Sequence, residues 1–398
     1  MHSLQVTQDI TWVGALDPNL RIFDIIMETK YGTTYNSYIV KGTEKIALFE
    51  TVKEGFFDEW LAKIEEVVDP SDIDYIILDH TEPDHGGSLA FVLDHCPKAT
   101  VVATQAAITF LEEIANRKFP HIVAKDSVSL DLGGKTLQFI MAPFLHWPDS
   151  MYTYIPESKV LITCDSFGCH YSDERVFNDA IDDPSDLMDA YKYYFDCIMG
   201  PFKTFVLSAL DKIKDLDISI ICPGHGPVLR KDLDKFLSLY RQWATATPRD
   251  IPCIVVAYVS AYGYTKTMAE AIAAGASEAG QLDILLYDLT QSPQSEVMEK
   301  IDTAAGVLFG SPTLVGEALP PILNLLASMN PIIHKGILAG AFGSYGWSGE
   351  AVPHIEERLK QLKLKMPVPG LKIRFKPSEA QLSDCRKFGR DFAEAVLK

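Results

Sequence analysis

The 398-residue sequence has no run of about 18 apolar residues, the length that a helix needs to span a bilayer. Its first residues, Met1 to Val6, lack the basic and then apolar pattern of a signal peptide. Basic side chains are also scarce, because 36 Lys and Arg stand against 54 Asp and Glu, giving a net charge of −18. Nucleic acids and anionic membranes bind basic patches. We therefore expect a cytoplasmic protein with neither nucleic acid nor membrane as a partner.

Cysteine is sparse, and no two cysteines have the CxxC spacing. An odd count of seven in a chain that is not exported predicts reduced thiols. The missing pairs also exclude a four-cysteine rubredoxin-type site and a thiolate-bound iron–sulfur cluster. Any electrons that the protein uses must then come from elsewhere.

The pattern of apolar residues changes near residue 250, which predicts an α/β protein of two domains, residues 1–249 and 250–398. Between about residues 35 and 250, β-rich segments such as Tyr38–Val40 alternate with helical ones such as Ala106–Asn116. This mixture is typical of a layered α/β sandwich. The polar segment Ala244–Pro252 carries two prolines and is the candidate linker.

After the linker, strands alternate with helices, which predicts a doubly wound parallel sheet. The expected elements are a helix at Thr267–Glu278 and strands at Ile254–Val259, Leu282–Tyr287, Gly306–Phe309 and Ile337–Phe342.

Four metal-capable side chains occur within six residues in His80-Thr-Glu-Pro-Asp-His85, just after a predicted strand at Tyr75–Leu78. Further candidates follow other predicted strands, where loops commonly carry chemistry: His146, Asp165 and His225. Each alone could be an ordinary turn residue, but four such segments in one chain favour a metal site. Carboxylates and histidines without a thiolate suit iron that changes oxidation state better than a closed structural zinc site.

The motif at residues 80–85 resembles the metal loop of the metallo-β-lactamase fold, except that Glu82 stands where a histidine is usual. Together with Cys-Pro-Gly-His-Gly at 222–226 and Asp-Ser-Phe-Gly at 165–168, it resembles flavodiiron proteins. The resemblance implies an αββα sandwich with two irons. One iron would be held by His80, Glu82 and His146 and the other by Asp84, His225 and, in some members, His85, with Asp165 bridging them.

The same resemblance implies that His170 and one of Tyr193 or Tyr194 lie near the diatomic ligand. Some relatives also carry a histidine near the N-terminal Phe-Asp, which the stretch Ile22–Met27 lacks. The preference between O2 and NO therefore stays open.

Three loops of the second domain resemble the FMN-binding loops of flavodoxins. The first joins a strand to a helix, where backbone N–H groups can hold a phosphate. The other two follow strands at the carboxyl edge of the sheet, where such folds bind ligands. The predicted FMN-binding residues are Ser260, Ala261, Tyr262, Gly263, Tyr264, Thr265, Ser311, Pro312, Thr313, Leu314, Ser344, Tyr345, Gly346, Trp347, Ser348 and Gly349. No strand is followed by the Gly-x-Gly-x-x-Gly turn that NAD would require.

Likeness to flavodiiron proteins implies reduction of O2 to water or of NO to N2O at a diiron centre, with electrons passing through FMN. It also implies a rubredoxin-like electron donor and a head-to-tail homodimer or a homotetramer. Two alternatives remain. A hydrolase would use a metal-bound hydroxide against a thioester or lactone, and an electron carrier would keep the first domain as an inert scaffold for a flavodoxin.

Overall fold

A computed structural model describes residues 1–24, 27–245 and 250–398. Backbone contacts divide the chain into two compact units, Met1–Thr245 and Ala246–Lys398. Residues 246–249 of the expected linker, and residues 25–26 of the Ile22–Met27 stretch, lie outside the described residues. Within the described ranges, no helix combines the length and apolar character that crossing a membrane requires.

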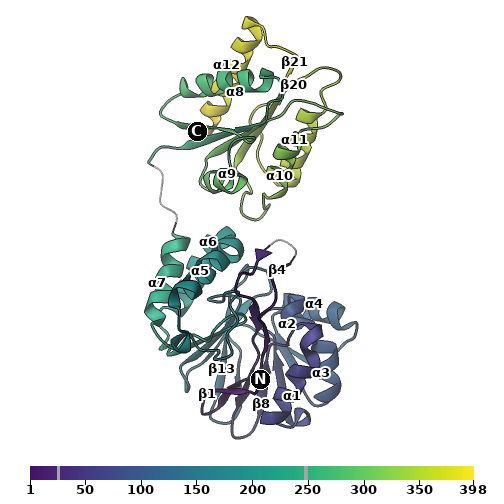
Figure 1. Cartoon of the computed structure of the whole chain (residues 1–398), viewed down its shortest axis with the longest axis vertical. Coiled ribbons are helices and arrows are strands. Elements are labelled where there is room, and N and C mark those ends of the chain that lie inside the picture. The colour runs from purple at the N-terminus through teal and green to yellow at the C-terminus, as the bar shows by residue number, and fades with distance from the viewer. Residues whose placement is uncertain (25–26, 246–249) are drawn as a thin grey trace. The chain divides into compact units, whose positions relative to one another are not determined.

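The first unit contains two sheets that pack face to face (Figure 1). The larger sheet has the strand order β1 (Leu4–Thr7), β2 (Ile10–Trp12), β7 (Tyr38–Lys41), β8 (Ile46–Phe49), β9 (Tyr75–Ile77), β10 (Thr100–Ala103), β11 (His121–Val123). The smaller sheet has the order β12 (Ser129–Asp131), β13 (Thr136–Met141), β14 (Met151–Ile155), β15 (Val160–Cys164), β16 (Ile220–Pro223). Two short ribbons pair β3 (Ala15–Asp17) with β6 (Thr33–Tyr35) and β4 (Ile22–Phe23) with β5 (Met27–Glu28).

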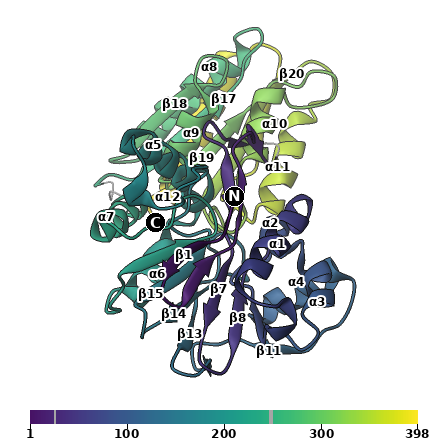
Figure 2. The same ribbon diagram turned by 60° about the horizontal axis from the view of Figure 1, so that its bottom comes forward.

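Helices cover the outer face of each sheet (Figures 1 and 2). The larger sheet packs against α1 (Phe57–Val67), α3 (Leu89–His95) and α4 (Gln105–Ala115), and the short helix α2 (Pro83–Gly86) contacts α4. The smaller sheet packs against α5 (Pro184–Tyr194), α6 (Lys203–Ile213) and α7 (Leu233–Ala244). The predicted αββα sandwich is confirmed.

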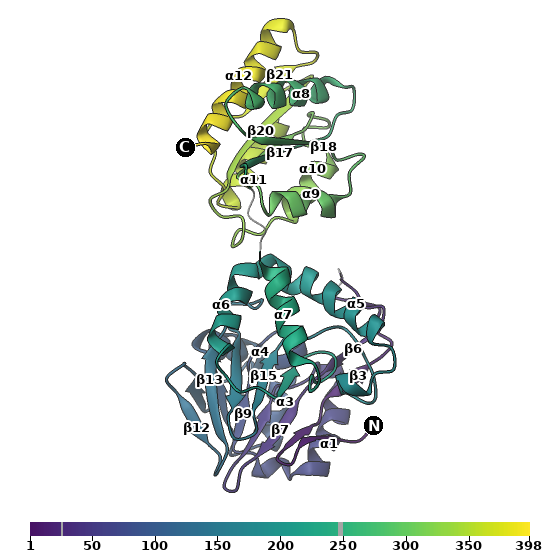
Figure 3. The ribbon, with the colours of Figure 1, turned by 90° about the vertical axis from the view of Figure 1, so that its left-hand side faces the viewer.

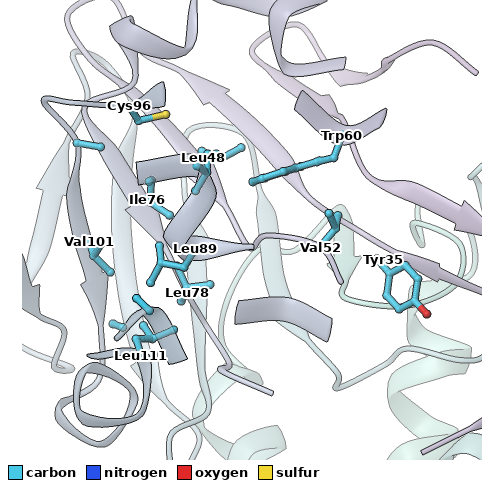
Figure 4. Packing of buried hydrophobic residues seen from close by; sticks show 14 of the residues in the cluster. Tyr35, Leu48, Val52, Trp60, Ile76, Leu78, Leu89, Cys96, Val101 and Leu111 are labelled. Carbon is cyan, nitrogen blue, oxygen red and sulfur yellow. The ribbon is translucent and has the colours of Figure 1, made fainter. Parts of the chain in front are cut away.

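The central strands are apolar on both faces because each face meets another layer. In β8, Leu48 points into the cluster beneath α1–α4, together with Trp60 and Leu111 (Figure 4), whereas Ala47 and Phe49 point between the sheets. This alternation follows from the two-residue period of a strand. Burying an aliphatic side chain of this kind contributes roughly 1.5–3 kcal/mol, so the sandwich provides a rigid support for the loops at its edge.

The second unit is a parallel sheet with the order β18 (Asp283–Asp288), β17 (Cys253–Tyr258), β19 (Gly306–Gly310), β20 (Leu338–Tyr345), β21 (Leu371–Arg374). One face packs against α8 (Tyr264–Ser277) and α12 (Glu379–Val396), and the other against α9 (Gln294–Ile301), α10 (Pro320–Ala327) and α11 (Ala351–Gln361) (Figure 3). The predicted doubly wound sheet is confirmed, and its order is that of flavodoxin-like folds.

Two element boundaries in this unit differ from the expected ones by three residues, and the others by one at most. Helix α8 begins at Tyr264 rather than Thr267, because Gly263, with φ of +83°, makes the sharp entry that only glycine adopts without strain. Strand β20 continues to Tyr345 because residues 343–345 still pair with β21. As a result, some residues of the predicted FMN-binding loops lie within α8 or within β20.

Candidate metal centre and flavin pocket

The seven predicted metal ligands come from loops at the ends of strands in the first unit. Glu82 precedes the short helix α2, and Pro83 at its first position fits the helical φ without losing a hydrogen bond. Asp84 and His85 lie in that same turn. His80 follows β9, and the remaining ligands follow three other strands: His146 after β13, Asp165 after β15 and His225 after β16. All seven lie in one cluster whose members come from four separate segments of the chain.

Six of these side chains form two trios. In the first trio, Glu82 Oε2 lies 3.0 Å from His146 Nε2 and 3.4 Å from His80 Nε2. In the second, Asp84 Oδ2 lies 3.0 Å from His225 Nε2 and 3.4 Å from His85 Nε2. Each trio therefore combines two imidazole nitrogens with one carboxylate, a set that could hold a cation.

Asp165 lies between the two trios and turns one carboxylate oxygen toward each. Its Oδ2 is 3.3 Å from His80 Nε2 and 3.4 Å from His146 Nε2. Its Oδ1 is 3.1 Å from His85 Nε2 and 3.5 Å from His225 Nε2. The Asp165 side chain is 97% buried. A carboxylate in this position can bridge two cations.

Outer partners orient three of the histidines. His80 Nδ1 lies 3.1 Å from Asp149 Oδ2, which also accepts a hydrogen bond from Thr81. His225 Nδ1 lies 2.6 Å from the Thr34 carbonyl oxygen, and His85 Nδ1 faces the Cys164 thiol. With Nδ1 engaged, Nε2 of each ring is directed to the cluster.

These outer partners were not among the predicted site residues. Asp149 had a signal in the sequence, since it stands three residues after His146 in a stretch with no other charge. The contact of Thr34 is made by a backbone carbonyl and has no signature in the sequence.

Among the protein groups alone, the carboxylates decide the histidine pKa values. Burial lowers the pKa of His225, but the hydrogen bond and charge of Asp84 outweigh it and raise the pKa to about 9. Burial likewise lowers the pKa of His146, and the hydrogen bonds to Asp165 and Glu82 raise it to about 9. Burial raises the pKa of Asp165, yet His85 and His146 hold it well below its usual range. The cluster thus favours positive charge between its carboxylates.

His170 and Tyr194 both adjoin this cluster. The Tyr194 hydroxyl donates a hydrogen bond of 3.1 Å to Asp165 Oδ1. The His170 ring centroid is 4.9 Å from that of Tyr194 and 5.3 Å from that of His225, and its Nδ1 lies 2.9 Å from Thr33 Oγ1. Burial and the neighbouring His225 lower the pKa of His170 to about 3, so the ring is neutral at pH 7.

Of the two tyrosine candidates, Tyr193 does not reach the cluster. Its side chain is 43% exposed and lines a surface pocket of about 180 Å³. Buried positions of α5 recur at Leu187, Ala190, Tyr191 and Tyr194, with the i, i+3, i+4, i+7 spacing of one helix face. This periodicity is readable in the sequence and would have selected Tyr194.

The predicted FMN loops of the second unit surround a pocket of about 640 Å³, a size usual for small-molecule sites. Ten predicted residues line it: Tyr262, Tyr264, Pro312, Thr313, Leu314, Ser344, Tyr345, Gly346, Trp347 and Ser348. The other six do not line it: Ser260, Ala261, Gly263, Thr265, Ser311 and Gly349. Two of them support the loops, since Thr265 Oγ1 lies 2.9 Å from Ser344 Oγ and Ser311 Oγ accepts a hydrogen bond from Leu319 N.

Phe375 is a further wall of this pocket that the sequence reasoning missed. Its ring packs against Gly346, where an added Cβ would lie 3.0 Å from the ring, and its backbone N–H donates to the Tyr345 carbonyl oxygen. Phe375 follows β21, whose pairing with β20 brings the two segments together. No local pattern in the sequence shows this.

Comparison with known proteins supports the fold of both units. The model of the ODP family beta lactamase matches residues 33–226, and the flavodoxin model matches residues 256–389. The flavo-diiron protein FprA2 of Clostridium acetobutylicum is 41% identical over 401 residues, covering all of both chains. The chain belongs to the flavodiiron protein family. A nitric oxide reductase of Moorella thermoacetica is 36% identical, covering 98% of each chain.

Among solved flavodiiron structures, the rubredoxin oxygen:oxidoreductase of Desulfovibrio gigas matches with a TM-score of 0.70 and 30% identity, covering 100% of this chain and 99% of the other. This result supports an oxidoreductase over the two alternatives, a hydrolase and an electron carrier.

The residues of this flavodiiron chain fit the two irons and the FMN of its family. The Oδ1 oxygen of the buried Asp84 accepts no hydrogen bond from any described residue, a costly arrangement unless a cation binds there. Nitrogen and carboxylate donors with no thiolate in either trio suit redox-active iron. The pocket in the second unit has the apolar and aromatic walls that an isoalloxazine ring needs.

Proposed function

We propose that this protein reduces O2 to water, NO to N2O, or both, with electrons that pass through FMN. The observation that carries the proposal is the position of Asp165, which directs one buried oxygen to each of two matching trios of ligands. Relatives named nitric oxide reductase and rubredoxin oxygen:oxidoreductase support both gases.

The proposed ligand assignment follows the two trios. His80, Glu82 and His146 would hold one iron, Asp84, His85 and His225 the other, and Asp165 would bridge them. Two irons held in this way would accept the electrons that pass through FMN and would offer open coordination positions for a diatomic gas.

The surrounding residues position these ligands and control proton positions. Asp149 fixes the ring of His80 through Nδ1. Burial raises the pKa of Tyr194 well above its usual value, so its hydroxyl keeps its proton and holds Asp165 by donation. His170 stays neutral and adds no positive charge beside His225. The side chains of Glu82 and His146 are 16% and 18% exposed, and they form the most accessible edge of the cluster.

In the second unit, the loop from Ser260 to Thr265 would hold the FMN phosphate at the N-terminus of α8. Lys266 N donates to Ser260 Oγ, which keeps this loop closed on the helix. Tyr345, Trp347 and Phe375 would flank the isoalloxazine ring.

The proposal also includes an electron donor and an oligomer, for which the family is the main support. A rubredoxin-like protein would deliver electrons in the cytoplasm, because no cysteine pair in this chain can bind a metal for electron transfer. A head-to-tail homodimer, or a tetramer of two such dimers, would bring the FMN of one chain to the irons of another.

Gas consumption tests this function. Protein loaded with iron and FMN and supplied with a chemical reductant should consume O2 or NO in a gas-sensitive electrode, whereas the same protein carrying Asp165→Ala should not. Equal consumption by the two proteins would show that free flavin chemistry accounts for the activity, and the proposal would fail.

A further inference from the structure

His85 has a polar neighbour at each of its two ring nitrogens. Its Nδ1 lies 3.4 Å from Cys164 Sγ, while its Nε2 lies 3.1 Å from Asp165 Oδ1. Both His85 and Cys164 are at least 98% buried. The His85 carbonyl oxygen also accepts hydrogen bonds from the backbone and the hydroxyl of Thr51. Contacts therefore hold both the backbone and the ring of His85.

Gly224 closes the remaining side of the ring. A Cβ at this position would lie 2.7 Å from His85 Cε1 and 3.1 Å from the Cys164 carbonyl carbon. Gly224 N also donates to the Cys164 carbonyl oxygen. The His85 ring thus rests directly on the backbone where β16 ends, beside the irregular pairing that ends β15.

Cys164 occupies a backbone conformation that favours this contact. Its φ is +47°, in the left-handed region, and it directly precedes Asp165. One bend of the chain therefore presents the thiol to one nitrogen of His85 and the bridging carboxylate to the other. A left-handed conformation is strained for a non-glycine residue, and the packing of the buried strand end offsets this strain.

We propose that Cys164 and Gly224 are positioning residues that fix His85 as a ligand of the second trio in this chain. The inference rests on the proposed diiron function. For Nε2 to offer its lone pair to a metal, the ring proton must reside on Nδ1, and Cys164 Sγ is the acceptor that Nδ1 faces. Gly224 leaves the room that the imidazole occupies, because a Cβ at this position would overlap His85 Cε1 and displace the ring.

The test is a Co²⁺ titration of metal-depleted, FMN-loaded protein, followed by visible absorption. Cys164→Ala should weaken one of the two Co²⁺ binding steps by roughly 10- to 100-fold, the usual effect of losing an outer partner, and Cys164→Ser should recover most of the affinity. Gly224→Ala should reproduce the spectrum of His85→Ala. In a His85→Ala background, Cys164→Ala should have no further effect, because the two residues act as a unit.

Cys222→Ala is the matched control, since it removes a buried thiol from the neighbouring strand β16 that points between the sheets. It should leave both binding steps unchanged. The proposal fails if Cys164→Ala binds Co²⁺ as the parent protein does, or if its effect simply adds to that of His85→Ala. Thermal unfolding of the metal-depleted variants identifies any loss of affinity that comes from misfolding, and Cys164→Ser then carries the test. The readout is metal binding, so a protein that binds two Co²⁺ but reduces neither gas would contradict only the proposed reductase function.

Discussion

Asp165 is the residue on which the paired metal site depends most. Replacing it with Ala should lower the metal content from two to fewer than one per chain, because both trios lose their shared carboxylate. Gas turnover should fall by roughly 100-fold or more, since even outer partners of metal ligands cost 10- to 100-fold. FMN should stay bound, because its predicted residues lie in the other unit. Elemental analysis and flavin absorbance measure both quantities, and a variant that keeps two irons would contradict the bridging role.

The histidines of the cluster make metal binding dependent on pH. Because the pKa values of His146 and His225 are raised to about 9, both rings carry a proton at pH 7 that a metal must displace. The affinity for Fe²⁺ should therefore rise as the pH increases from 6.5 toward 9 and level off above it. Anaerobic titrations against a chelator at several pH values measure this, and an affinity independent of pH would show that the rings are already neutral.

At the scale of elements, most strands could be predicted from the sequence, but the contacts between strands could not. The apolar runs of β8, β15 and β19 are visible because strands buried on both faces need continuous apolar side chains. The metal ligands were recognisable because they follow such runs at one edge. Phe375 was not, because its place in the flavin pocket depends on the pairing of β21 with β20, which no local pattern encodes.

The loop after β20 should contribute to FMN binding through Trp347, which lines the flavin pocket and whose side chain is 91% exposed. Trp347→Ala should weaken FMN binding by about 2- to 10-fold, because an aromatic contact of this kind contributes roughly 0.5–1.5 kcal/mol. Flavin fluorescence during titration measures the affinity. Phe91→Ala, an exposed aromatic in the first unit, is the control and should have no effect. Unchanged FMN affinity in the Trp347 variant would remove this residue from the site.

At the scale of the whole molecule, the proposal requires more than one chain. Light scattering on the iron- and FMN-loaded protein should give twice or four times the mass of a single chain at the concentrations used for turnover. Dilution that produces monomers should slow gas reduction more than metal or FMN loss explains. A monomer with full activity would contradict the head-to-tail arrangement, and electrons would then have to pass within one chain.

The most direct test of the central claim is anaerobic reduction of protein with a measured metal and flavin content, followed by stopped-flow mixing with O2 and, separately, with NO. We predict two irons and one FMN per chain, and reoxidation of the flavin by at least one gas that is rapid in the parent protein and slow in Asp165→Ala. Zinc in place of iron, with slow reoxidation that Asp165→Ala leaves unchanged, would contradict the account.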